Sequence, residues 1–345
     1  MTLSNEDKLL LACTRIRLED KSIHKIKELI SNDLNWEYIV KNASRYGIAP
    51  LLFHSLRNIN ENGIIPQEFM EALKKGYYDN ALRNMKLYNE LGKFLKALKN
   101  TGIDVIVLKG AVLAETVYQD IGLRPMGDID IMVRFDRKNE NHVNSIINAD
   151  TPLFDIHENL RGRDSFNRKI NTQKLWENAE PIKLANVETL KLCPEHQLLH
   201  LIVHGNYFRG IIWLCDIAEF VRYYKDSMDW EKAISEAKQY GYKNLFFFQL
   251  YSAWKLLDAP VPDDVLYALQ PNWIKRFLIK KLINERKFGQ IEKSFFNIFF
   301  NINRPFKVHV LEALTIDGVK DVLRRIYFLF RKIIKKLSSN YECLP

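Results

Sequence analysis

Two acidic residues, two positions apart, have the spacing of a metal-binding pair. Asp128 and Asp130 occur in the segment DIDIMV, where polar and apolar residues alternate as in a half-buried strand. Side chains at positions i and i+2 of a strand point to the same face, so both carboxylates should project together, opposite Ile129, Ile131 and Val133. Adjacent carboxylates repel each other unless a cation lies between them. The pair therefore predicts a divalent-metal site suited to Mg²⁺, with exposed acids beside a turn as the alternative.

Residues upstream of this pair are of the types that bind phosphate. The segment LKG ends a β-branched run where a helix is expected to begin, and helix N-termini offer free N–H groups to anions. Gly110 would let a phosphate approach closely, while Lys109 and Arg124 are candidate phosphate ligands. Taken singly, Gly110 is most simply a turn glycine, and Lys109 and Arg124 are most simply solvated charges. Their occurrence together in one strand–helix–strand unit favours a phosphate site.

A third acid follows in LFDIHENL, a segment that is typical of a strand. Asp155 lies in this segment, and His157 shares its face because it is two positions away. His157 could contact a phosphate or orient Asp155, and a purely structural histidine is an equal alternative. Another helix is expected to carry His196, His200 and His204 as one stripe; packing against the core is favoured there over zinc binding.

The elements that must position these residues form an α/β core between helical regions. A strand from Ile103, a helix over AVLAETVY, the strand DIDIMV, a helix over 136–149 and the strand LFDIHENL make up this core. Apolar spacings near 3.6 predict helices on both sides of the core. The N-terminal helices are expected at 22–30, 35–46, 50–59 and 66–99, and the C-terminal ones at 194–203, 211–224, 230–240 and 245–257. The predicted class is α+β, with a helical region 1–100, a catalytic core 101–190 and a helical region 191–345.

The string LKGAVLAETVYQDIGLRPMGDIDIMV resembles the signature of the bacterial uncharacterised nucleotidyltransferase family, within the DNA polymerase β-like superfamily. The superfamily pattern is a glycine at a strand–helix turn, a D-x-D or D-x-E strand, and a third acid on a later strand. Here Gly110, then Asp128 and Asp130, then Asp155 match that pattern. The likeness continues through KLWENA and LLHLIVHG to IIWLCDIAEF, and so covers about residues 100–225.

The resemblance implies a small mixed-sheet nucleotidyltransferase core and a metal-dependent enzyme. Such an enzyme moves a nucleoside monophosphate from a nucleoside triphosphate, with ATP expected, to a hydroxyl acceptor that the sequence does not identify. In the two-metal mechanism of this superfamily, Asp128 and Asp130 would hold one Mg²⁺ or Mn²⁺. Asp130 and Asp155 would hold the second. Lys109, Gly110, Arg124 and His157 would bind the nucleotide.

Two departures from the superfamily pattern leave alternatives open. Ala111 stands where many members have serine, so a phosphate-binding hydroxyl is missing. Only 24 residues separate Asp130 from Asp155, a short interval that could displace the third strand. The alternative function is then a non-catalytic nucleotide-binding or regulatory module of the same fold.

Composition limits the other partners. The 51 basic and 42 acidic residues give a formal charge of +9, which suits anionic partners and keeps an RNA-modifying transferase as a less favoured alternative.

The four cysteines form no CxxC pair, which argues against a zinc ribbon or a disulfide framework and fits a reducing cytoplasm. No signal peptide and no apolar run of roughly 18 residues is present, so a cytoplasmic protein without a transmembrane segment is expected. The basic amphipathic segment 322–337 could contact a membrane, but a solvated terminal helix is favoured.

Overall fold

The computed structural model describes residues 3–60, 63–134, 153–157, 159–160, 170–204 and 211–283, together with Thr315 and Asp317. The helix expected over 136–149, the basic segment 322–337 and Cys343 lie outside the described residues. Cys13, Cys193 and Cys215 are buried free thiols.

The N-terminal region is helical, as the sequence predicts. Its elements are α1 (Asn5–Ala12), α2 (Asp20–Ile30), α3 (Trp36–Arg45), α4 (Ala49–Arg57) and the 33-residue α5 (Gln67–Lys99). The Ser4 and Asn35 side chains cap α1 and α3 by accepting hydrogen bonds from backbone N–H groups of the first turn. Gly102 takes a left-handed conformation, with φ at 73°, just after α5 ends.

A five-stranded mixed sheet forms the core, which confirms the α+β class. Its strands are β1 (Val105–Val107), β2 (Ile129–Val133), β3 (Phe154–His157), β4 (Glu180–Leu184) and β5 (Val187–Lys191), in the order β3-β2-β1-β5-β4. β1 pairs antiparallel with β2 and parallel with β5, whereas β2 pairs parallel with β3. β2 and β1 are therefore neighbours inside the sheet. The candidate acids lie at the start of β2, and the LKG turn follows β1.

The hairpin of β4 and β5 was not among the predicted strands. Its two-residue turn consists of Ala185 and Asn186, both with positive φ, as a type I′ turn requires. Pro181 is tolerated because β4 is an edge strand. The alternation of EPIKL and VETLK around an Asn-containing turn was the available signal.

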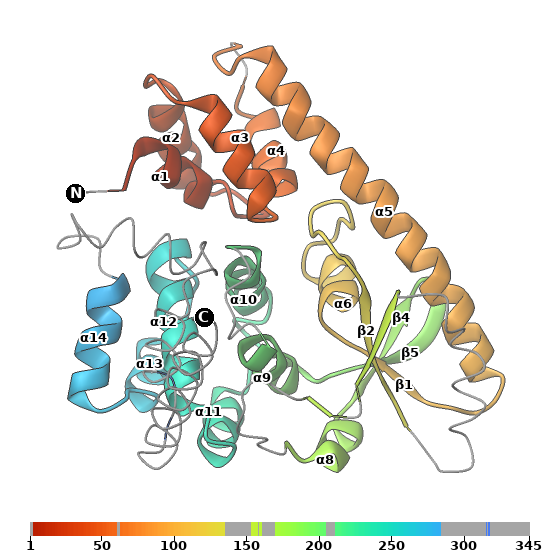
Figure 1. Cartoon of the computed structure of the whole chain (residues 1–345). Coiled ribbons are helices and arrows are strands. Elements are labelled where there is room, and N and C mark those ends of the chain that lie inside the picture. The colour runs from red at the N-terminus through yellow and green to blue at the C-terminus, as the bar shows by residue number, and fades with distance from the viewer. Residues whose placement is uncertain are drawn as a thin grey trace, which may run out of the picture.

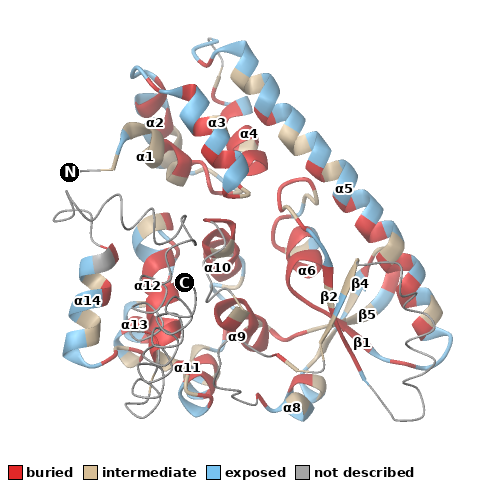
Figure 2. Cartoon of the chain, in the orientation of Figure 1, coloured by how far each residue is buried: buried red, intermediate tan, exposed pale blue. Residues whose placement is uncertain are grey.

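The two faces of the sheet pack against different helices. One face meets the C-terminal half of α5, where Leu91, Leu95 and Leu98 share a cluster with Val107 and Ile131. α5 runs as one long rod past the sheet to the N-terminal helices (Figure 1). The opposite face, which includes Ile106 and Met132, belongs to the larger core that the other helices form. The buried positions on both sides of the sheet are visible in Figure 2.

The remaining helices complete this larger core. They are α6 (Lys109–Thr116), α8 (Thr172–Glu177), α9 (Pro194–His204), α10 (Ile211–Tyr223), α11 (Trp230–Gln239), α12 (Lys243–Leu257), α13 (Asp263–Ala268) and α14 (Trp273–Ile283). Leu10 and Leu51 from the N-terminal helices share one apolar cluster with Phe246 and Phe248 of α12, so helices before and after the sheet in the sequence build the same core. Among the described helices, none has the length and apolar character to cross a membrane.

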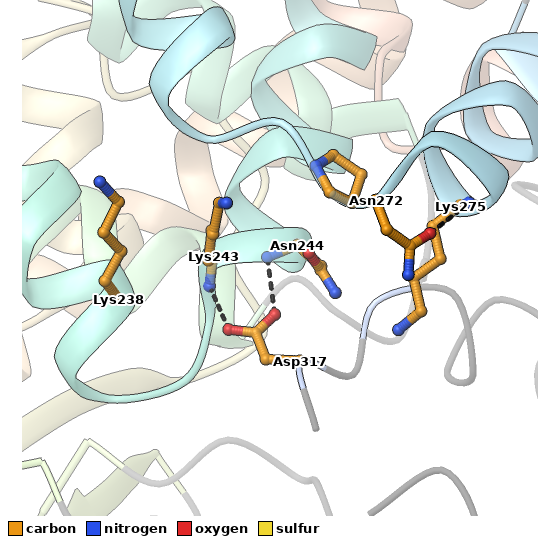
Figure 3. A pocket seen from close by; sticks show the side chains of 7 residues that line it. Lys238, Lys243, Asn244, Asn272, Lys275 and Asp317 are labelled. Atoms are coloured by element: carbon orange, nitrogen blue, oxygen red, sulfur yellow. Dashed lines mark hydrogen bonds between the residues drawn. The ribbon is translucent and has the colours of Figure 1, made fainter. Parts of the chain in front are cut away.

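A cavity of about 440 Å³ opens between the start of α12 and the start of α14 (Figure 3). The Asp317 carboxylate caps α12 there, accepting hydrogen bonds of 2.8 Å from the backbone N–H groups of Lys243 and Asn244. The residues that line the cavity are Lys238, Lys243, Asn244, Pro271, Asn272, Lys275 and Asp317. None of them belongs to the sheet, α6 or α9.

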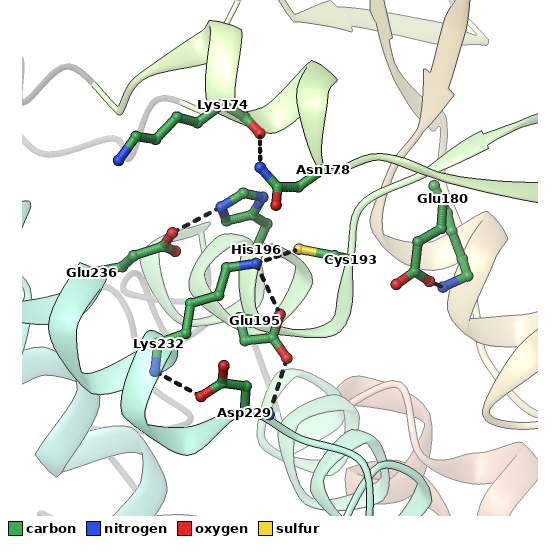
Figure 4. Close-up of polar contacts among 10 residues, drawn as sticks. Lys174, Asn178, Glu180, Cys193, Glu195, His196, Asp229, Lys232 and Glu236 are labelled. Atoms are coloured by element: carbon green, nitrogen blue, oxygen red, sulfur yellow. Dashed lines mark hydrogen bonds and ion pairs between the residues drawn. The ribbon is translucent and has the colours of Figure 1, made fainter.

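Buried polar contacts join α9 to α11 (Figure 4). His196 Nε2 lies 3.0 Å from Glu236 Oε1, and Lys232 Nζ lies 3.3 Å from Glu195 Oε2. Burial alone would lower the pKa of His196, but interactions with Cys193 and Glu236 raise it to about 9. His196 is therefore protonated at neutral pH and paired with an acid of the neighbouring helix.

Because the folded pKa of His196 is raised, its contribution to stability is complete below the unfolded pKa and disappears as pH rises through the folded value. We expect the free energy of unfolding to fall, by at most roughly 3 kcal/mol, between pH 6.5 and 9. Urea unfolding at several pH values measures this. Glu236→Gln should destabilise the protein at pH 6 and leave it close to wild type at pH 9.5. An equal loss of stability at both pH values would contradict the raised pKa of His196. The control is His24→Gln, at an exposed position of α2.

Candidate functional site

The register of β2 and β3 brings two of the predicted acids together. Asp130 lies directly opposite Asp155 in this parallel pair. Ligand atoms of Asp130, Asp155 and His157 all lie within 4.8 Å of one another. Ile156 packs against the α5 cluster on the other face, as the alternation predicts. The short interval before Asp155 therefore does not displace the third strand.

Asp128 lies just outside this group. It precedes β2 by one residue, is exposed, and is not among the three residues with ligand atoms within 4.8 Å. Partial burial raises its pKa, and the negative charges of Asp130 and Asp155 raise it further. Asp128 thus experiences the repulsion that the sequence predicts, from a position at the edge of the site.

Lys109 provides the positive charge nearest to the acids. Its Nζ lies 2.5 Å from Asp130 Oδ1 and 3.2 Å from His204 Nε2, and the residue is only 1% exposed. Burial lowers the pKa of Lys109, and Asp130 opposes this effect most strongly. The backbone φ of Lys109 is 45°, a left-handed conformation that costs a non-glycine residue roughly 1–3 kcal/mol. The residue with this backbone conformation is the one that neutralises Asp130.

Asp130 is held as a carboxylate by two donors. Burial alone would raise its pKa, but the hydrogen bond from His157 Nε2, at 2.8 Å, and the Lys109 ammonium keep it well below the ordinary value. His157 Nε2 is also 3.4 Å from Asp155 Oδ2. His157 therefore links the two acids, in agreement with the predicted shared face.

Two of the three histidines of α9 border this site. The His200 ring lies 6.2 Å from that of His157 and 5.9 Å from that of His204, whereas His196 faces α11. Burial, with the nearby Lys109 charge, keeps the pKa of His200 far below its ordinary value, so this ring is neutral. In the described part of the chain the stripe forms no metal-binding group of its own. His200 thus packs between His157 and His204, whereas His196 packs against α11.

The structure pairs the Arg124 side chain with Asp216, at a distance where its charge still acts on Asp128 and Asp130, and the contact of Arg124 with a phosphate stays a prediction. The guanidinium is buried, with Nη2 2.8 Å from Asp216 Oδ2 and Nε 3.3 Å from Asp216 Oδ1. Gly110 is directly beneath it, because a Cβ at that position would lie 2.2 Å from Arg124 Nη1. The partner of the Arg124 guanidinium is thus a carboxylate that lies 92 positions away in the sequence. The sequence does not reveal such a distant partner.

Comparison with known protein families finds a match to a family described as uncharacterised nucleotidyltransferases, over residues 32–146 and again over 136–258. Together these segments extend over more than half of the 345 residues and contain Lys109, the three acids and α9. Neither a curated protein nor a solved structure matches the chain.

The different surroundings of Asp128 and Asp130 predict opposite effects on stability. Asp128→Asn removes repulsion at an exposed position, so the free energy of unfolding should be unchanged or slightly raised. Asp130→Asn leaves the buried Lys109 ammonium without its partner and should cost about 3 kcal/mol. Urea unfolding in EDTA, which excludes bound metal, measures both values. Equal effects of the two substitutions would show that the Lys109 pair does not stabilise the fold.

Proposed function

Because this chain belongs to the uncharacterised nucleotidyltransferase family, we propose that it transfers a nucleoside monophosphate from a nucleoside triphosphate to a hydroxyl acceptor. The observation that carries the proposal is the convergence of Asp130, Asp155 and His157 beside the start of α6. ATP is the proposed donor. The acceptor is a small molecule, a protein or an RNA, and the labelling experiment below separates these classes.

The donor set fits a divalent cation. Two carboxylates and one imidazole have ligand atoms within 4.8 Å of one another, and carboxylate oxygens are the ligands that Mg²⁺ and Mn²⁺ prefer. The Asp155 side chain is 56% exposed, so the group is accessible from solvent. A bound Mg²⁺ or Mn²⁺ would supply positive charge for the triphosphate and for the attacking oxygen. In the two-metal form of the proposal, Asp128 and Asp130 would hold one cation, and Asp130 and Asp155 would hold the other.

Lys109 has two roles in this proposal. In the structure its ammonium neutralises Asp130, at 2.5 Å. The ammonium is also proposed to contact an oxygen of the triphosphate, together with the N–H groups at the start of α6. His157 keeps Asp130 in place through their hydrogen bond and is proposed to contact a phosphate oxygen. Gly110 belongs to the same turn.

The transfer forms one bond, between the acceptor oxygen and the α-phosphorus, and breaks two. The acceptor hydroxyl gives up its proton to water, and pyrophosphate leaves as the bond between the α-phosphorus and its bridging oxygen breaks. Asp155 is the most exposed member of the acid group, so it is proposed to lie on the acceptor side. The buried Lys109 and the largely buried Asp130 are proposed to lie on the donor side.

The deciding experiment is incubation of the protein with each α-labelled nucleoside triphosphate and Mg²⁺ or Mn²⁺, followed by analysis of protein, RNA and small-molecule fractions. We expect cation-dependent labelling that is lost in Asp130→Asn. The matched control is Asp226→Asn, since Asp226 is an acid whose side chain is 89% exposed. Label in RNA would favour the RNA-modifying alternative. Nucleotide binding without any labelling would identify a non-catalytic module.

Binding of the donor should depend on the cation, because paired carboxylates repel a triphosphate. Calorimetric titration with ATP should give at least tenfold weaker binding in EDTA than in Mg²⁺, a difference of about 1.4 kcal/mol. Asp155→Asn should weaken Mn²⁺ binding by a similar factor, and Asp226→Asn should not. Equal ATP affinity with and without EDTA would exclude the metal site.

A further inference from the structure

The loop that leads into Asp128 is held by α5 on one side. Asn80 Nδ2 donates to the carbonyl oxygen of Gly122 at 2.7 Å, and Asn84 Nδ2 donates to that of Arg124 at 2.8 Å and to that of Ile121 at 2.5 Å. Both asparagines are buried. Helix positions four apart lie on the same face, so α5 presents these amides to the loop as a pair. The loop backbone is thereby fixed to the long helix.

The other side of the loop is held by α10. The Arg124 guanidinium forms its two-point ion pair with Asp216, and the Tyr118 hydroxyl donates to Asp216 Oδ1 at 2.8 Å. The guanidinium also lies 5.5 Å from the centre of the Trp213 ring, which in turn lies 5.3 Å from the ring of His204. Asp216 is fully buried. Such a two-point Arg–carboxylate pair defines direction as well as distance.

Gly110 makes room for this arrangement. Besides the 2.2 Å to Arg124 Nη1, a Cβ there would lie 3.0 Å from the guanidinium carbon and 3.1 Å from Met126 Cγ. Any side chain at position 110 would therefore push Arg124 away from Asp216. This close approach explains the glycine of the LKG turn without any contact to phosphate.

We propose that Arg124 and Asp216 are positioning residues that fix the loop before β2, and through it the Asp128 and Asp130 carboxylates. Asp128 follows Arg124 by four positions; Pro125 restricts the backbone after Arg124, and the Met126 side chain is anchored in the cluster on α5, so the link is short. A buried ion pair adds little net stability compared with apolar packing. The role of the Arg124–Asp216 pair is instead to fix the direction of the loop that carries the acid pair. The statement that Asp128 and Asp130 take part in nucleotidyl transfer rests on the proposed function.

Asp216→Asn tests the proposal because it keeps the shape of the side chain and removes the charge. The matched control is Glu219→Gln, which removes another buried acid of α10 that pairs with Arg222 within the helix. Amide hydrogen exchange should become at least tenfold faster over residues 119–130 in Asp216→Asn and remain unchanged there in Glu219→Gln. Calorimetric titration with Mn²⁺ should give about tenfold weaker binding in Asp216→Asn alone.

A second pair of variants separates this role of Gly110 from a phosphate contact. Gly110→Ala should accelerate exchange over residues 119–130 as Asp216→Asn does. In an Arg124→Ala background the added methyl group meets no guanidinium, so it should cause little further acceleration. Additive effects of the two substitutions would assign Gly110 a role independent of Arg124 and overturn this part of the proposal.

The outcomes distinguish this proposal from the proposed function. Unchanged exchange over 119–130 in Asp216→Asn, or equal changes in Glu219→Gln, would overturn the positioning role. Faster exchange with unchanged Mn²⁺ affinity would show that the loop is fixed but that the acids do not depend on it, which also overturns the proposal. If the wild-type protein binds no Mn²⁺, the proposed function fails, while the exchange pattern still decides whether Arg124 and Asp216 hold the loop.

Discussion

Electrostatic repulsion between carboxylates at the ends of β2 and β3 is the constraint that organises the site. Two negative charges at the separation of Asp130 and Asp155 repel by on the order of 3–4 kcal/mol at an effective dielectric constant of about 20. A buried ammonium from Lys109 and a hydrogen bond from His157 offset this repulsion. The ring of His200, whose pKa burial and the Lys109 charge keep far below its ordinary value, adds no further positive charge beside them.

The sequence predicts the acid-bearing strands because their information is local. The alternation in DIDIMV and LFDIHENL specifies which side chains share a face, and the observed register places Asp155 beside Asp130. Lys109 and Arg124 are different, since either cation could serve a phosphate or an acid. Their environments depend on Asp130 and on the distant Asp216, which only the folded chain brings close. Partner choice among charged residues is thus a property of the tertiary structure.

The β4–β5 hairpin shows a second limit of sequence reasoning. Its strands mix charged with apolar residues and contain Pro181, so local propensity gives a weak signal. The hairpin is stabilised by its position, because Leu184 and Val187 join the cluster on α5. A Cβ at Gly92 of α5 would lie 3.1 Å from the Ala185 carbonyl oxygen, so helix and turn are in close contact. Long-range packing, which no local pattern encodes, selects the strand conformation.

The arrangement of α5 affects how this protein can vary during evolution. The helix contributes apolar side chains to one face of the sheet, amides to the loop before β2, and, near its start, Leu73 to the core of the N-terminal helices. A recombination event that joined the sheet of one relative to the N-terminal region of another at residue 100 would replace the contacts of α5 with the sheet and with the loop, and would keep only those of Leu73 with the N-terminal helices. Crossover before α5 would instead transmit the helix with the sheet that it covers. The segment that must be inherited together with the sheet therefore begins near Gln67, well upstream of β1.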